Sequence, residues 1–254
     1  MKELVYKILD IFTGSKGLRK TINGFPVKLP TRYINYFPSD YEQENFEFLK
    51  QHVNAGDHVL DIGAHIGLFA VATAQLTGSK GRVFAFEPAT ETNTLLKQTI
   101  AINHFENVIE PRNEAMGATS GKVTFYVSDV KGDNSNSMVS YKDDRQLHAM
   151  EVNMYSIDDF VKEKGLSSLA FMKIDVEGAE YDALRGAAET LKKLRPVCIV
   201  AIHPEPIAAK GDSLEKIYDL IAANNYKIYY NKQIISKESF CNNRELIDLH
   251  IIPV

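Results

Sequence analysis

The chain has 254 residues, of which 44% are hydrophobic and 24% are charged, the composition of a globular protein with one large domain or two small ones. Its formal net charge is 29 − 33 = −4, so it lacks the basic excess of a general nucleic-acid-binding protein, and we expect no nucleic-acid partner. The two cysteines, Cys198 and Cys241, form no CxxC pair, which argues against a zinc cluster and a thioredoxin-like redox site.

The N-terminal region predicts a helix followed by loops. Residues 2–13 carry apolar side chains at helical spacing, so we expect an amphipathic helix that docks on the protein itself or forms a homodimer contact. Its polar face has mixed charge, whereas membrane-surface helices tend to have a basic one. No apolar run approaches the ~18 residues of a membrane span and no signal-peptide cleavage site follows, so we expect a cytoplasmic protein without a transmembrane span. Residues 14–38 predict loops with short strands.

From about residue 40 the chain alternates strands and helices. After a helix that ends near residue 53, the expected elements are strand 57–62, helix 66–77, strand 82–87, helix 90–104, strand 107–111, strand 169–175, helix 179–193, strand 196–203, helix 213–224 and strands 226–231 and 246–252. Apolar strands that alternate with helices indicate a doubly wound, Rossmann-like α/β fold, with a mostly parallel sheet covered on both faces. Residues 121–155 interrupt it as an inserted strand-loop-strand. We therefore expect an extension over 1–39 and one domain over 40–254.

The most informative motif is VLDIGAHIG at a predicted strand-to-helix junction. Asp61, Gly63 and Gly67 form D-x-G-x-x-x-G, where the first glycine allows a tight turn against a ligand and the second lets the helix pack closely. Free N–H groups at the start of this helix can bind a carboxylate. A dinucleotide-binding Rossmann oxidoreductase would instead show G-x-G-x-x-G, which this stretch lacks.

Two further acids follow at the ends of the next predicted strands. Glu87 stands twenty residues after Gly67, where a carboxylate can accept hydrogen bonds from both ribose hydroxyls, and Pro88 ends its strand. Glu114, between Asn113 and Ala115, can accept a hydrogen bond from an adenine amino group. With Asp61 placed to bind an amine-bearing group, the three acids predict a pocket for S-adenosylmethionine rather than NAD.

These segments, together with FMKIDVEGAE and IVAIHPE, resemble the FkbM-type S-adenosylmethionine-dependent methyltransferases over about residues 40–204. The resemblance implies the class I methyltransferase fold, a seven-stranded sheet with one antiparallel strand. It also implies methyl transfer to a hydroxyl of a small-molecule or carbohydrate-like acceptor. The cofactor residues that it implies, with the neighbours of the motifs, are Asp61, Gly63, Ala64, Gly67, Glu87, Pro88, Asn113, Glu114, Ala115 and Asp175.

Candidate catalytic residues follow the last two parallel strands. Asp175 ends one strand and is the first candidate for the base that takes the hydroxyl proton, and His203 ends the next strand and is the second. Glu177 could assist catalysis and Glu180 could bind substrate, although both could equally be first-turn acids that stabilise a helix dipole. His203 could equally be a strand-end residue with a backbone hydrogen bond.

Other roles stay open at this stage. Asp175, Glu177 and His203 could together hold a divalent metal such as magnesium, but no ligand spacing requires one, so we assign no metal. Asn136 and Ser137 could bind a sugar-like acceptor or simply form a turn. Alternative functions are an S-adenosylmethionine-binding module without catalysis and an N-methyltransferase.

Overall fold

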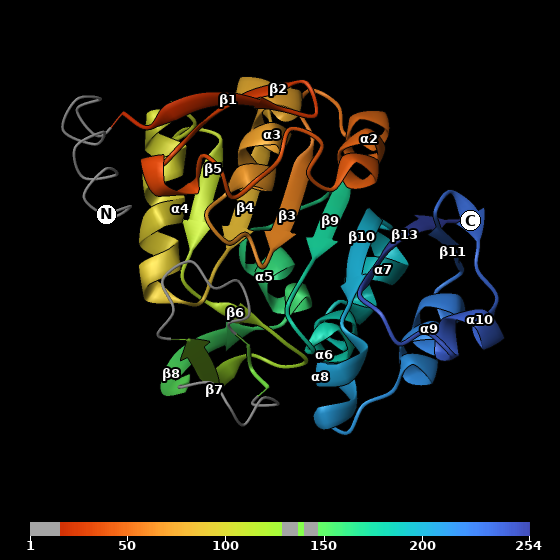
Figure 1. The fold of residues 1–254 in the computed structure, drawn as a ribbon. Coiled ribbons are helices and arrows are strands. Elements are labelled where there is room, and N and C mark those ends of the chain that lie inside the picture. Colours follow the sequence, from red (N-terminus) through yellow and green to blue (C-terminus); the bar gives the residue numbers. More distant parts are fainter. Residues whose placement is uncertain (1–15, 129–136, 140–146) are drawn as a thin grey trace.

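The computed structural model describes residues 16–128, 137–139 and 147–254. At its centre is a sheet with the strand order β12-β11-β13-β10-β9-β3-β4-β5 (Figure 1). The strands are β3 (His58–Ile62), β4 (Arg82–Phe86), β5 (Ile109–Arg112), β9 (Phe171–Ile174), β10 (Val197–Ile202), β11 (Tyr226–Tyr230), β12 (Gln233–Ile234) and β13 (Ile247–Pro253). The run from β10 to β5 is parallel, which confirms the expected mostly parallel, Rossmann-like sheet.

The strand count differs from the expected seven, and two strands run antiparallel to their neighbours instead of one. β13 is antiparallel to both β10 and β11, as one strand was expected to be. The eighth strand, β12, has two residues and pairs back on β11. Asn231 and Lys232 both have positive φ, 48° and 63°, the conformation that closes a two-residue hairpin. This turn was not predicted from the sequence.

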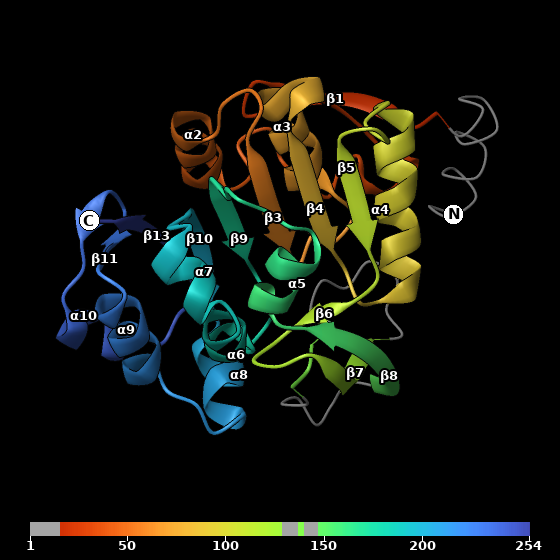
Figure 2. The ribbon, with the colours of Figure 1, turned by 180° about the vertical axis from the view of Figure 1, so that it is seen from behind.

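Helices and a hairpin cover both faces of the sheet (Figures 1 and 2). On one face the apolar core contains residues of the hairpin β1 (Leu18–Ile22) and β2 (Phe25–Leu29) and of helices α2 (Gln43–His52), α3 (Leu68–Thr77) and α4 (Thr90–Ile102). On the other face it contains residues of α5 (Ile157–Glu163), α6 (Glu180–Arg185), α7 (Ala188–Lys193), α8 (Pro204–Ala209), α9 (Leu214–Ala223) and α10 (Lys237–Cys241). Short 3-10 turns lie at η1 (Thr31–Tyr33) and η2 (Gly78–Lys80).

The hairpin confirms the short strands expected between residues 14 and 38, and it is bound to the body of the protein. Asn103, which follows α4, accepts a hydrogen bond from the backbone N–H of Lys28 and donates one to its carbonyl oxygen, each 2.8 Å long. The helix expected at 2–13, and with it the homodimer contact, falls outside the described residues. Among the residues that are described, no helix has the length and apolar character needed to cross a membrane.

The helix expected over 179–193 is instead two short helices, α6 and α7. At the break, a Cβ on Gly186 would lie 2.1 Å from the carbonyl oxygen of Gly117, so the backbone passes too close to its neighbour for a larger residue. Asp158 then caps the second helix, because its carboxylate accepts hydrogen bonds from the backbone N–H groups of Glu189 (2.9 Å) and Thr190 (2.8 Å). Because Asp158 is distant from α7 in the sequence, local periodicity does not predict this cap.

The insertion forms a second, smaller sheet. β7 (Gly121–Ser128) and β8 (Leu147–Tyr155) pair antiparallel, close to the expected strands 122–128 and 148–155, and β6 (Ala115–Met116) pairs with β8. Figure 1 shows this sheet beyond the carboxyl ends of β4 and β5. Its buried side chains Phe125 and Val152 pack with Ala89 and Ala115, which follow β4 and β5. The insertion therefore stands next to the edge of the central sheet where ligands bind in this type of fold.

The cap of α7 gives a test of the fold. Replacing Asp158 with Ala removes the acceptor for two helix N–H groups, so we expect the free energy of unfolding to fall by about 1–2 kcal/mol. Urea unfolding of the variant measures this loss. Lys162→Ala, at an exposed position on α5, should change stability by less than about 0.5 kcal/mol. Equal stability of the two variants would contradict the capping role.

Candidate active site

The strand-end residues picked out in the sequence meet in one cavity of about 340 Å³ at the carboxyl edge of the central sheet. Its wall runs from Asp248 on β13 to Glu114 beyond β5. The expected site residues that line it are Asp61, Gly63, Ala64, Glu87, Pro88, Glu114, Ala115, Asp175, Glu177 and His203. Gly67, Asn113, Ser137 and Glu180 are described but do not line it, and Asn136 lies outside the described residues.

The glycine turn after β3 lies against the end of the neighbouring strand β9. Gly63 has φ 83°, and a Cβ there would lie 1.8 Å from the carbonyl oxygen of Asp175, so only glycine fits between β3 and the end of β9. Gly67 has φ 90° and precedes α3, where a Cβ would lie 2.5 Å from a methyl group of Leu96. Gly67 thus acts through helix packing and not as part of the cavity wall.

Asp61 is a fully buried carboxylate that lines the cavity. Among the described residues neither of its oxygens has a hydrogen-bond partner. Burial raises its pKa to about 7, although the nearby charge of Lys173 acts in the opposite direction. A buried, unpartnered anion of this kind is suited to a cationic ligand group, and the ammonium group of an amino-acid tail would supply both charge and hydrogen bonds.

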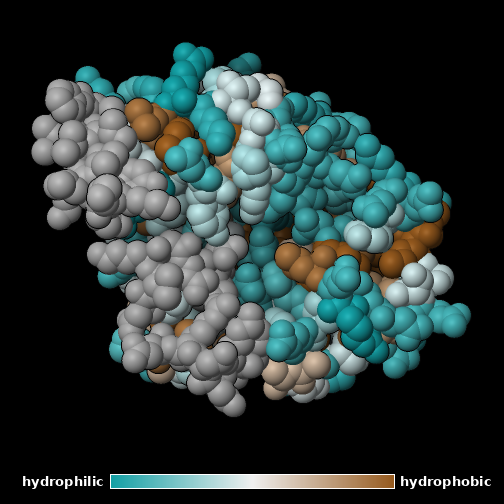
Figure 3. All heavy atoms as spheres, in the orientation of Figure 1, coloured by the Kyte–Doolittle hydropathy of each residue, from teal (hydrophilic) through white to brown (hydrophobic). Residues whose placement is uncertain are grey.

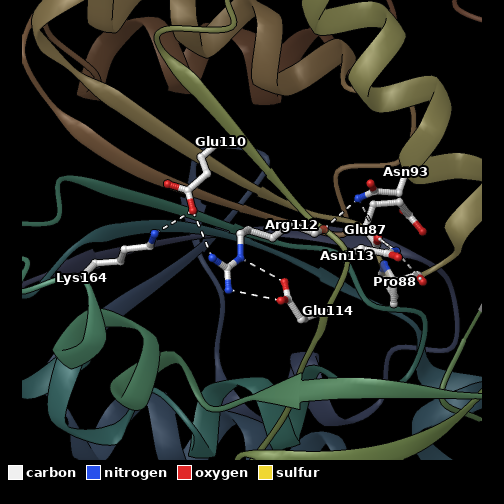
Figure 4. Close-up of polar contacts among 8 residues, drawn as sticks. All are labelled: Glu87, Pro88, Asn93, Glu110, Arg112, Asn113, Glu114 and Lys164. Carbon is white, nitrogen blue, oxygen red and sulfur yellow. Dashed lines mark hydrogen bonds and ion pairs between the residues drawn. The ribbon is translucent and has the colours of Figure 1, made fainter.

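Glu87 lies at the end of β4 and is held by the glycine turn. Its two carboxylate oxygens accept hydrogen bonds from the backbone N–H groups of His65 (3.1 Å) and Ala89 (2.9 Å), and burial raises its pKa to about 7. Asn113 donates to the carbonyl oxygens of Glu87 and Pro88, each at 2.9 Å (Figure 4). Asn113 therefore fixes the strand end, and its side chain does not line the cavity.

Glu114 is fixed by a chain of charges at the far end of the cavity (Figure 4). Arg112 binds both of its carboxylate oxygens, at 3.0 and 3.2 Å, and also contacts Glu110 at 3.1 Å. Glu110 in turn accepts a hydrogen bond from Lys164 at 2.7 Å. A bidentate guanidinium contact sets the orientation of a carboxylate and leaves it further lone pairs, so Glu114 can still accept a hydrogen bond from a ligand.

Asp175 is ion-paired rather than free. Its Oδ2 lies 2.6 Å from the Nζ of Lys173, a buried side chain that also lines the cavity. Burial would raise the pKa of Asp175, but the charges of Lys173 and His203 outweigh it and hold the pKa below its usual range. Asp175 is therefore an ionised, weakly basic group at the centre of the cavity wall.

His203 lies within reach of three carboxylates. Its Nδ1 is 2.7 Å from Glu180 Oε1, and its Nε2 is 3.5 Å from Glu177 Oε1 and 3.7 Å from Asp175 Oδ1. Burial would lower the pKa of the imidazole, but hydrogen bonds to Glu177 and Glu180 raise it to about 11. His203 is thus a cation at neutral pH. Glu180 is fully buried behind it, so its expected direct contact with substrate does not match its position.

The positions of Asp175, Glu177 and His203 show whether these residues could bind a metal, as the sequence suggested. Asp175, Glu177 and His203 each offer one ligand atom, and these atoms lie within 4.8 Å of one another. Glu180 orients the other ring nitrogen of His203, as a carboxylate behind a metal-binding histidine often does. The residues could therefore hold a divalent cation, but a protonated His203 satisfies the same carboxylates.

Several cavity residues had no signal in the sequence. Glu42 and Asp248 line the wall, and Asn45 bridges them with hydrogen bonds of 3.1 and 2.8 Å. Asp248 follows no motif, and 203 positions separate it from Asn45. Ser137, an expected substrate residue, donates a hydrogen bond to the backbone oxygen of Glu177 at 2.6 Å and so supports the loop that carries Glu177.

A Rossmann-like sheet with a glycine turn and acids at its successive strand ends defines the class I methyltransferase fold. The chain belongs to the methyltransferase FkbM domain family, whose pattern matches residues 61–228. Among solved structures, a Clostridium thermocellum protein provisionally described as an rRNA methylase has the same fold, with a TM-score of 0.52 and 12% identity, over 84% of this chain and 95% of the other.

Two curated relatives are similar to the chain over its central part. One is the hexuronic acid methyltransferase AglP of Haloferax volcanii, 27% identical over 64% of this chain and 62% of the relative. The other is the 2-O-methyltransferase NoeI of Sinorhizobium fredii, 29% identical over 54% of this chain and 60% of the relative. The matches thus span about three fifths of the length of these relatives.

The raised pKa values of Asp61 and Glu87 make cofactor binding sensitive to pH. Below pH 7 Asp61 must lose a proton before it can form an ion pair with a cation, and loss of the Glu87 proton strengthens the hydrogen bonds it accepts from a ribose, so we expect the affinity for S-adenosylmethionine to rise several-fold from pH 6 to 7.5. Calorimetric titration measures it. Asp61→Asn should weaken binding and reduce this dependence, and a wild-type affinity that is constant over the range would contradict the assignment.

Proposed function

We propose that the protein transfers the methyl group of S-adenosylmethionine to a hydroxyl of a carbohydrate-like acceptor. The single observation that carries the proposal is the buried Asp61 carboxylate, unpartnered among the described residues, in the same cavity as Glu87 and Glu114. This arrangement fits an ammonium group, a ribose and an adenine in that order along β3, β4 and β5. Family membership supports methyl transfer, and the two curated relatives support an oxygen acceptor on a sugar.

The chemistry needs an acceptor oxygen aligned with the methyl group and a place for the hydroxyl proton. The cofactor supplies an electrophilic methyl group on a positively charged sulfur. Asp175 stands in the centre of the cavity wall, next to the glycine turn, and we propose that it accepts a hydrogen bond from the acceptor hydroxyl and orients it. As the carbon–oxygen bond forms and the carbon–sulfur bond breaks, the hydroxyl proton passes to the carboxylate of Asp175, which stands with that of Glu177 beside His203. His203 holds these carboxylates in place through its charge.

Substituting Asp175 with Asn tests this role. The amide keeps the shape of the side chain but loses the charge, so we expect turnover to fall by about 10²-fold or more, while S-adenosylmethionine affinity changes by less than about threefold. Formation of S-adenosylhomocysteine with a panel of hexoses and hexuronic acids measures turnover. Full turnover by the variant would remove Asp175 from the reaction, and cofactor binding without turnover on any acceptor would favour the non-catalytic alternative. Methylation at an amine instead of a hydroxyl would favour the N-methyltransferase.

A chelator distinguishes between two states of the cluster of Asp175, Glu177 and His203: one in which His203 is protonated, and one in which the cluster binds a divalent cation. Because protonated His203 already satisfies Glu177 and Glu180, we expect turnover to survive EDTA. Loss of turnover in EDTA, with recovery on addition of Mg²⁺, would instead assign Asp175, Glu177 and His203 as ligands of a divalent cation.

A further inference from the structure

We propose that the end of the cavity over β9, β10 and β13 is a seat for an uncharged, polyhydroxylated ring, and that Glu42 and Asp248 bind its hydroxyls. This seat consists of Glu42, Asp175, Ala201, Leu246 and Asp248, all of which line the cavity. The proposal rests on the proposed function and narrows its acceptor to rings without a negative charge.

The strand order separates this seat from the cofactor end. Adjacent strands lie about 4.8 Å apart, so the five steps from β13 to β5 place the two ends of the cavity roughly 24 Å apart. The cofactor-type residues Asp61, Glu87 and Glu114 follow β3, β4 and β5. The part of the cavity over β9, β10 and β13 is therefore left for the acceptor, with Asp175 at the junction of the two parts.

The floor of the seat has two carboxylates with a small residue between them. Ala201 on β10 is paired with Asp248 on β13. On its other side, Val200 of β10 is paired with Ile174 of β9, so the next residues along these parallel strands, Ala201 and Asp175, also lie side by side. Residues that are level on adjacent strands point to the same face of a sheet. The middle position carries only a methyl group, so the side chain of Ala201 does not separate the two acids, and all three residues line the cavity.

Hydrogen bonds hold the two acceptor groups of the seat. Asn45 is buried, and its amide nitrogen donates to Glu42 (3.1 Å) and Asp248 (2.8 Å). His250 Nε2 lies 3.0 Å from the Asn45 amide oxygen, and because burial lowers the pKa of His250 to about 4, its neutral ring donates this hydrogen bond. Both carboxylates thus have fixed positions, and each keeps lone pairs that can accept hydrogen bonds from hydroxyls.

The charges of the seat oppose a negatively charged ligand. Burial raises the pKa of Asp248 to about 6, with Glu42 and Asp175 adding to the effect and Lys173 opposing it, so Asp248 is ionised at pH 8. The described cations nearest the seat, Lys173 and His203, are already paired with carboxylates. A carboxylate on the acceptor would therefore lie among like charges, which disfavours binding.

An apolar rim completes the seat. Leu246, just before β13, is 63% exposed and lines the cavity. In Figure 3, apolar side chains form a band across the right half of the face shown, over the β10–β13 end of the sheet. A sugar ring has apolar C–H surfaces as well as hydroxyls, so a seat with acids on its floor and an aliphatic rim matches both parts of such a ligand.

Two probes that differ in one group test the proposal. Methyl β-D-glucopyranoside and its glucuronide differ only in a hydroxymethyl group against a carboxylate, and both are titrated into the protein saturated with S-adenosylhomocysteine at pH 8. We expect the neutral glycoside to bind at least about tenfold more tightly, equivalent to about 1.4 kcal/mol. In Asp248→Asn the ratio of the two dissociation constants should fall at least about threefold.

The controls separate charge in the seat from general effects. Asp219→Asn removes a charge of the same kind on α9, away from the cavity, and should leave the ratio unchanged. The Asp248→Asn variant must keep the wild-type melting temperature and the wild-type affinity for S-adenosylhomocysteine. If this variant does not fold, the same experiment is done with Glu42→Gln. Tighter or equal binding of the glucuronide, an unchanged ratio in the seat variant, or binding of neither ring would overturn the proposal. A wild-type protein that binds no S-adenosylhomocysteine would instead overturn the proposed function.

Discussion

The cavity depends on one buried ammonium group, that of Lys173. This side chain lies on β9 between acids of neighbouring elements and forms its closest contact, 2.6 Å, with Asp175. Burial opposes its charge, but the charges of Asp175, Glu42 and Asp61 outweigh burial and hold its pKa above the usual range. Without this cation, the acids would face one another in a poorly hydrated space, and several would have to take up protons.

The buried acids lower the free energy of unfolding of the ligand-free protein when they are charged, and a bound ligand can restore it. The folded-state pKa values of Asp61 and Glu87, about 7, lie above those of unfolded carboxyl groups, so their protonated forms favour folding. That contribution is complete at acid pH and is lost as the pH rises from about 4 through 7. On the proposed function, a cationic cofactor would offset the loss, because it would pair with Asp61 in the charged form. Burial of Asp61 and Glu87 therefore affects both the free energy of folding and the free energy of ligand binding.

Local sequence patterns were enough for much of the fold and for the strand-end residues that line the cavity from β3 to β5. D-x-G-x-x-x-G and the strand-end acids Glu87 and Glu114 could be predicted because parallel strands bring their carboxyl ends to one edge. The other end was not predictable in this way. Asp248 sits in an antiparallel strand with no motif, and Glu42 reaches the cavity from the start of α2 in a left-handed conformation. Their meeting depends on tertiary packing across the whole chain.

The same physical reason explains why some of the predicted residues do not line the cavity and why one predicted helix is divided. Glu180 and Asn113 have the residue types of ligand contacts, but Glu180 Oε1 contacts His203 and the amide nitrogen of Asn113 is bonded to the end of β4. The break between α6 and α7 follows from contacts with Gly117 and Asp158, which lie far away in sequence. Sequence periodicity describes an element alone and cannot indicate which neighbour will use a polar group or crowd a backbone.

The position of β13 has a consequence for synthesis of the protein on the ribosome. This strand begins at Ile247, yet it lies inside the sheet, between β10 and β11, and carries Asp248 to a partner 203 positions earlier. A nascent chain can assemble β3, β4, β5, β9 and β10 before β13 has left the exit tunnel, but it cannot pair β11 with the rest of the sheet. The cavity wall that follows β3, β4, β5, β9 and β10 can therefore form before β13 emerges, whereas the wall at β13 forms only once that strand has left the tunnel, a long-range step of the kind that slows folding.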